Sequence, residues 1–133
     1  MLADVSSGDS HTLEWLIEEE HCTIRGEYRI FATPDLVLMV EAAAIELLAP
    51  HLPEGQSSVG SKIDIAHTAP TLLGQRVRCT ATVTVVDRRR VEFDVEAHDG
   101  LDTICTGSHE RFVVDLDKFG NRLAEKAAAV AAG

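Results

Sequence analysis

One stretch decides the fold of this chain, TPDLVLMVEAAAIELLAP at residues 33–50. Its start has three helix signals, because a hydroxyl can cap free amides, proline suits the first turn and an acid suits the helix dipole. Pro50 ends the pattern, since proline is not tolerated in a helix interior. We therefore predict a helix of about four turns over 33–49. Apolar residues occur on nearly all its sides, which indicates that other structure wraps it.

After residue 57 the pattern changes to the period of two that is typical of strands, with many β-branched residues. We predict four strands there, in SVGSKIDIAHT (58–68), RVRCTATVTVVD (76–87), RVEFDVEAHD (90–99) and DTICTGSHERFVVDL (102–116). Short turns separate them at 70–74, 87–89 and 99–100, which makes the sheet mainly antiparallel. Weaker patterns predict strands over 12–18 and 23–30 and a terminal helix over 118–132.

The length of 133 residues indicates one domain, spanning 1–133, with 1–10 loosely ordered and 118–133 a C-terminal helix or tail. A buried helix followed by antiparallel strands is an α+β arrangement, and wrapping the sheet around the helix is the simplest way to bury it. Periodicity alone does not choose among the α+β folds.

The net charge of −10 argues against nucleic acid or an anionic membrane as partner, because phosphate-rich surfaces attract basic proteins. A phosphorylated ligand needs a local basic cluster. The sequence contains no apolar run of membrane-spanning length and no signal-peptide pattern, so we expect a cytoplasmic protein without a membrane partner. Three cysteines without CxxC spacing predict reduced thiols, and no histidine pair has metal-ligand spacing, so we predict no metal and no cofactor.

Two ionisable residues are candidates for catalysis. Glu41 has apolar neighbours three and four positions away on the predicted helix, a setting that suits a general base or nucleophile. Its alternative is a helix acid that reaches solvent or pairs with a basic residue at a dimer contact. His67 ends a predicted strand, where an imidazole can transfer protons near neutral pH, and its alternative is a structural histidine. Glu46 is assigned to the surface.

Three further features have both a structural and a functional interpretation. Thr33 is either a helix cap or a nucleophile or orienting donor, and it lies about 12 Å from Glu41 along the helix, too far for direct contact. Gly60 interrupts a strand, which indicates either a β-bulge or close approach of a ligand or backbone. The arginine run at a hairpin either contacts phosphates of coenzyme A or is a solvated turn, and consists of Arg88, Arg89 and Arg90.

Two segments, residues 31–77 and AHDGLDTICTGSHERFVVDLDKF (97–119), resemble the fluoroacetyl-CoA thioesterase family of hotdog proteins. The resemblance rests on the helix with its embedded acid, the SVGS strand, the AHTAPT strand end and the HDG and GSHER motifs. It implies a hotdog fold, with an antiparallel sheet around a central helix. It also implies a homodimer whose sites form between two chains.

The resemblance implies that Thr33, Glu41 and His67 form the catalytic set and that the backbone amide of Gly60 binds the thioester carbonyl. The implied reaction is hydrolysis of a small acyl-CoA, in which coenzyme A is part of the substrate. A carboxylate or hydroxyl assisted by the imidazole either attacks or activates water, and backbone amides stabilise the oxyanion.

Family members selective for the fluorinated acyl group have a long aromatic lid before the helix. Here the segment 22–30 is short and Tyr28 is its only aromatic residue. The acyl group therefore stays open, as do two alternative functions. One is an acyl-CoA-binding hotdog protein without catalysis, and the other is a hotdog hydratase or dehydratase acting on enoyl- or hydroxyacyl-CoA.

Overall fold

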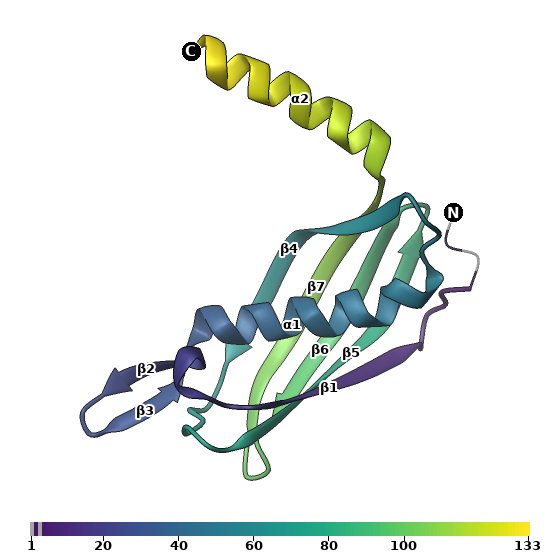
Figure 1. Ribbon diagram of the computed structural model, residues 1–133. Coiled ribbons are helices and arrows are strands. Elements are labelled where there is room, and N and C mark those ends of the chain that lie inside the picture. Colours follow the sequence, from purple (N-terminus) through teal and green to yellow (C-terminus); the bar gives the residue numbers. More distant parts are fainter. Residues whose placement is uncertain (1, 3) are drawn as a thin grey trace.

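The computed structural model describes residue 2 and residues 4–133, which form a five-stranded antiparallel sheet wrapped around one long helix (Figure 1). The sheet has the strand order β1-β5-β6-β7-β4, and a separate hairpin consists of β2 and β3. This arrangement confirms the predicted α+β hotdog fold. The elements are β1 (Ser10–Leu16), η1 (Glu19–His21), β2 (Cys22–Arg25), β3 (Tyr28–Phe31), α1 (Thr33–Leu48), η2 (Ala49–His51), β4 (Gln56–His67), β5 (Arg76–Asp87), β6 (Arg90–His98), β7 (Thr103–Asp115) and α2 (Leu116–Ala132).

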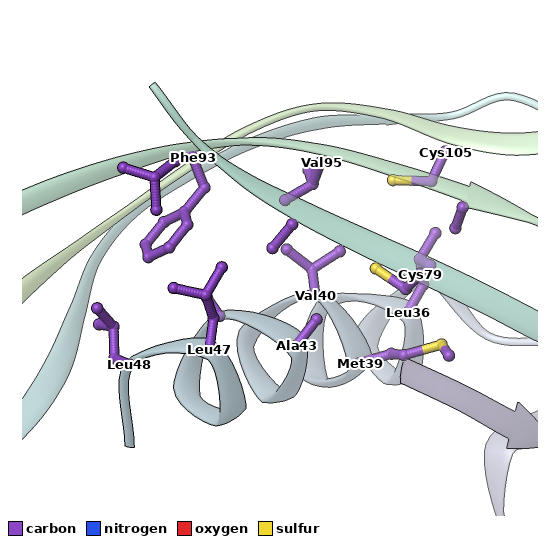
Figure 2. Packing of buried hydrophobic residues seen from close by; sticks show 14 of the residues in the cluster. Leu36, Met39, Val40, Ala43, Leu47, Leu48, Cys79, Phe93, Val95 and Cys105 are labelled. Atoms are coloured by element: carbon purple, nitrogen blue, oxygen red, sulfur yellow. The ribbon is translucent and has the colours of Figure 1, made fainter. Parts of the chain in front are cut away.

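The helix α1 presents one face to the concave side of the sheet (Figure 2). Val40 and Leu47 on this face pack with side chains such as Phe93 of the sheet, and all three are at most 6% exposed. The opposite face is different, because Leu38 and Ile45 are 57% and 44% exposed. The prediction that other structure wraps the helix is therefore met on one side only within a single chain.

Local differences from the sequence prediction have simple physical causes. The predicted strand 23–30 is two strands, β2 and β3, because Gly26 turns the chain with a positive φ of 60°. The segment 1–10 is not loose where it is described, since the apolar side chains of Leu2 and Val5 are both 6% exposed in the core. Residues 1 and 3 lie outside the described chain. The predicted terminal helix is α2, which extends away from the sheet (Figure 1).

A β-bulge in β4 determines which side chains face the helix. The pairing of β4 with β7 shifts between Gly60 and Lys62, so Ser61 is the extra residue. Gly60 pairs with Arg111 and His67 pairs with Cys105, and these two β7 residues lie on the same face of their strand. Gly60 and His67 therefore share the helix-facing side, although they are an odd number of positions apart. β4 also forms one edge of the sheet.

Candidate active site

The first site cluster joins the start of α1 to the end of β4. The Oγ1 of Thr33 lies 2.8 Å from Nδ1 of His67, so the hydroxyl makes a hydrogen bond with the imidazole. Thr33 does not cap the helix, because Ala32 occupies the N-cap position and no side chain caps there. The predicted capping role of Thr33 is therefore wrong. Its hydroxyl instead orients the ring of His67.

Burial favours the neutral form of the His67 imidazole, and only one of its two nitrogen atoms makes a hydrogen bond in the described chain. Burial lowers the pKa of His67, although the nearby backbone carbonyl of Ala69 favours the protonated ring and partly opposes this. The Nε2 atom is buried without a hydrogen-bond partner in the described part of the chain. When the Thr33 hydroxyl donates to Nδ1, the ring proton is on Nε2 and needs an acceptor. Buried polar atoms are almost always satisfied, so this atom indicates a missing group.

The second cluster surrounds the carboxylate of Glu41. Its Oε2 lies 3.4 Å from Nη1 of Arg111, whose side chain is 4% exposed. The guanidinium is held in turn by Ser58, because Nε donates to Oγ over 2.9 Å and Nη2 donates to the backbone oxygen over 3.0 Å. Burial lowers the pKa of Arg111, while the charge of Glu41 raises it. The setting of Glu41 is therefore an ion pair rather than the apolar stripe that the sequence predicts.

A buried histidine completes this second cluster. His109 is 2% exposed, and its Nδ1 lies 2.8 Å from the backbone oxygen of Lys62. Since a carbonyl only accepts, Nδ1 is the protonated nitrogen of the neutral ring, and Nε2 accepts from Nη1 of Arg111 at 3.3 Å. Burial lowers the pKa of His109, which agrees with a neutral ring. His109 and Arg111 come from the GSHER motif, and sequence reasoning gave neither a role.

Gly60 allows the carboxylate of Glu41 to lie directly on the strand. A Cβ atom at Gly60 would come within 2.6 Å of Oε2 of Glu41 and 3.2 Å of Nη1 of Arg111. A bulge follows this glycine, as one of its two interpretations expects, whereas the other interpretation named a ligand or a backbone as the approaching group. The approaching group within the chain is a side chain.

The two clusters are separate within one chain. Thr33 and Glu41 are about 12 Å apart along α1, and Gly60 and His67 are roughly 23 Å apart along β4. His67 lies beside Thr33 rather than between Thr33 and Glu41. Of the three expected catalytic residues, Thr33 and His67 therefore lie together, and Glu41 lies apart from them beside Arg111 and Gly60.

A cavity of about 530 Å³ opens beside Thr33 and His67. One wall of this cavity is the β2–β3 hairpin, and the other is the loop that follows β4. The hairpin projects from the rest of the molecule (Figure 1). Arg25 is the only permanently charged group in its lining. The lining residues are Thr23, Arg25, Ile30, Phe31, Ala32, Thr33, Pro34, His67, Thr68, Ala69 and Pro70.

The arginine run lies at the other end of the sheet. Arg88 forms the β5–β6 turn with a positive φ of 59°, next to the end of β7. Arg90 is surrounded by acids, namely Asp87, Glu92 and Glu110. Arg89 pairs with Asp115 over 3.1 Å. Within one chain, none of these arginines belongs to the cavity beside His67.

No three His, Cys, Asp or Glu side chains of residues 2 and 4–133 are grouped as a metal site would require. None of the helices described is both long enough and apolar enough to cross a membrane.

Comparison with known proteins gives consistent matches. The sequence model of a family described as fluoroacetyl-CoA-specific thioesterase matches residues 16–117. The fluoroacetyl-CoA thioesterase of Streptantibioticus cattleyicolor is 41% identical over 97 residues, which cover 73% of this chain and 70% of that protein.

Solved structures show the same similarity. A structure of fluoroacetyl-CoA thioesterase superposes with a TM-score of 0.86 at 32% identity, covering 92% of this chain and 97% of the other. A Thermus thermophilus thioesterase superfamily member superposes with a TM-score of 0.91 at 26% identity, covering 98% of this chain and 99% of the other. The second match extends over nearly the whole chain.

Proposed function

Since the chain belongs to the fluoroacetyl-CoA-specific thioesterase family and is an acyl-CoA thioesterase, we propose that it hydrolyses a small acyl-CoA in sites shared between two copies. The buried and unpartnered Nε2 of His67 is the observation that supports a shared site. A carboxylate from a second copy is the acceptor that this atom lacks. Glu41 is the carboxylate that a two-fold axis can bring there.

The geometry of the edge strand supports this pairing. β4 lies at the edge of the sheet, and a two-fold axis near its middle would pair two β4 strands antiparallel. Such an axis moves the Gly60 end of one strand to the His67 end of the other. Because the Glu41 carboxylate lies against Gly60 in each chain, the same axis also brings Glu41 of one copy to the His67 end of the other. The same dimer would cover Leu38 and Ile45, the exposed apolar residues of α1.

In this arrangement each residue has a distinct part in hydrolysis. Thr33 orients His67, the Nε2–H group of His67 donates to the Glu41 carboxylate of the second copy, and that carboxylate removes a proton from water. The water oxygen bonds to the thioester carbonyl carbon, and the backbone amide of Gly60 stabilises the oxyanion. The carbon–sulfur bond then breaks, and the thiolate of CoA takes up the proton. The same groups also serve a route in which the Glu41 carboxylate or the Thr33 hydroxyl attacks first and water hydrolyses the covalent intermediate.

Release of free thiol from a panel of acyl-CoAs tests the reaction. We expect Glu41→Gln and His67→Ala each to lower kcat by about 10²–10⁴-fold with little change in KM, because both groups act as the thioester is attacked. The double variant should be scarcely worse than the poorer single variant. A folded Glu41→Gln protein with normal turnover would show that this carboxylate is structural.

Subunit mixing tests whether the site is shared. A heterodimer of one Glu41→Gln chain and one His67→Ala chain contains one intact shared site, so co-expression should recover about a quarter of wild-type activity. If Glu41 served the His67 of its own chain, every site in the mixture would stay inactive. Sedimentation gives the second reading, since a particle of 14.4 kDa at micromolar concentration would exclude the dimer.

We expect no strong preference for the fluorinated acyl group. The hairpin wall of the cavity offers Thr23, Arg25 and Ile30, with no aromatic side chain from β2 or β3 except Phe31 at its base. Short acyl groups should therefore be hydrolysed without marked discrimination. A preference of several hundredfold for fluoroacetyl-CoA over acetyl-CoA, by kcat/KM, would contradict this.

We place the reaction in the cytoplasm because the cysteines of the described chain are free thiols. Burial raises the pKa of Cys79 to about 12 and that of Cys105 to about 11, so both thiols stay protonated and unreactive. A protein that stays in the cytosolic fraction on cell disruption would agree with this location, and one recovered from an oxidising compartment would not.

A further inference from the structure

A second groove, of about 260 Å³, lies where α2 leaves the end of β7. Its apolar part includes Val114 and the half-buried ring of Phe119, the only aromatic residue of α2. Its other lining residues are Arg89, Val113, Asp115, Lys118 and Arg122. An apolar floor is thus combined with three cationic side chains from the β5–β6 turn and α2.

The charge balance of this groove is opposite to that of the whole chain. Asp115 is its only acid, 3.1 Å from Arg89 and 3.9 Å from Lys118. Arg122 has no carboxylate within salt-bridge distance in the described chain. Three cations therefore face one carboxylate, in a protein with a net charge of −10. A ligand with several phosphates would be repelled by most of this surface and attracted here.

We propose that this groove binds the adenosine 3′,5′-bisphosphate end of coenzyme A, an inference that rests on the proposed thioesterase function. Arginine and lysine pair well with phosphate oxygens, so Arg89, Lys118 and Arg122 hold the phosphates. Phe119 provides an aromatic face on which adenine stacks. Arg90 is not part of this site, because Asp87, Glu92 and Glu110 already surround it.

The distance to the reacting group agrees with the length of the substrate. Gly60 pairs with Arg111, and Gln56 pairs with Asp115, so four strand residues, about 13 Å, separate the carbonyl-binding position from the groove. Asp115 lies on the same face of β7 as Arg111. The extended pantetheine arm joins the thioester to the phosphates of CoA over a distance of the same order. A substrate with its carbonyl at Gly60 can therefore place its nucleotide in this groove without bending back.

The test compares substrates with and without the nucleotide. The double variant Lys118→Ala/Arg122→Ala should raise KM for acetyl-CoA by about 10- to 100-fold, as the loss of charge-assisted hydrogen bonds predicts, with kcat unchanged. For S-acetylpantetheine, which has no phosphates, the same variant should leave KM as in wild type. Arg78→Ala is the matched control, because Arg78 is an exposed arginine of β5 outside the groove, and it should leave both KM values unchanged.

Calorimetry with adenosine 3′,5′-bisphosphate gives a reading that does not depend on hydrolysis. The wild-type protein should bind it, and the double variant or Phe119→Ala should bind it at least tenfold more weakly, with melting temperatures recorded to show that each variant is folded. Equal binding by wild type and the double variant, or an unchanged KM for acetyl-CoA, would overturn the groove assignment alone. Failure to hydrolyse either thioester would instead contradict the proposed function, and the calorimetry would still decide the groove.

Discussion

Gly60→Ala is the sharpest test of how Glu41 is placed. The added Cβ would lie 2.6 Å from Oε2 of Glu41, whereas an ordinary contact begins at 3.4 Å. The carboxylate must therefore move by about 0.8 Å, which is the difference between these distances. The oxygen is the end of a flexible side chain, so it can move without disturbing the strand. Its contact with Arg111, already 3.4 Å, would be altered as well.

The expected effect is on rate rather than on folding. A misplacement of about 1 Å in a catalytic site can cost about 100-fold, so we expect kcat for acetyl-CoA to fall by about that factor. The free energy of unfolding, measured with urea, should change by less than about 1 kcal/mol, since the atoms displaced are the ends of two side chains, the Glu41 carboxylate and, by a few tenths of an ångström, Nη1 of Arg111. Thiol release gives the rate and denaturant titration gives the stability of the same preparation.

Gly120→Ala is the matched control, because a Cβ there meets nothing within 4 Å. It removes a glycine from the interior of α2 and should stabilise that helix by about 0.5–1 kcal/mol without lowering kcat. A folded Gly60→Ala protein with wild-type kcat would refute the placement of Glu41 on this strand. So would losses that add fully in a Gly60→Ala/Glu41→Gln double variant, since both changes are expected to act through one carboxylate.

Three other expectations follow from the contacts of single residues. Thr33→Ala should lower kcat by about 10- to 100-fold while shifting the melting temperature little, because its hydroxyl bonds His67 and caps nothing; a large loss of stability would contradict this. Burial lowers the pKa values of His67 and His109 below 6.5, so the acid limb of kcat/KM should lie below pH 6.5. Their contribution to stability should be complete above pH 6.5 and decrease as the pH falls towards the folded pKa values, which urea titrations across pH 5–7 would measure. Asp99→Asn should cost about 1–3 kcal/mol in the same titrations, because its buried carboxylate accepts from the Thr71 hydroxyl and two backbone amides, and an unchanged midpoint would refute that estimate.

The sequence was sufficient for the main elements because their signals are local. Proline and acid at the start of α1 and the period of two in β4 to β7 depend only on neighbouring residues. The hairpin of β2 and β3 was predicted as one strand, because each of its strands has only four residues and Gly26 is its only turn signal. The burial of Leu2 and Val5 was also missed, since isolated apolar residues in a polar segment form no periodic pattern.

The site could be predicted only in part, because its contacts join distant positions. The resemblance grouped Thr33 and His67, but the residue pattern alone gave them only as separate candidates, because their hydrogen bond links positions 34 residues apart. Arg111 lies 70 positions from Glu41, so the neighbours of Glu41 on its helix gave no sign of the ion pair. The available signal was that His109 and Arg111 are two positions apart and share one face of a strand. Using it requires the register of β7 against β4, which local pattern does not provide.

The bulge at Ser61 implies that the number of residues in β4 is constrained separately from their identity. Regular pairing would turn one of Gly60 and His67 away from the helix, since an odd spacing places two residues on opposite faces. Deleting Ser61, or inserting one residue between it and His67, would reverse the face of one end. Related sequences should therefore keep the residue count of this segment fixed, with apolar residues at the positions of Ile63 and Ile65, so insertions and deletions are expected in the loops on either side.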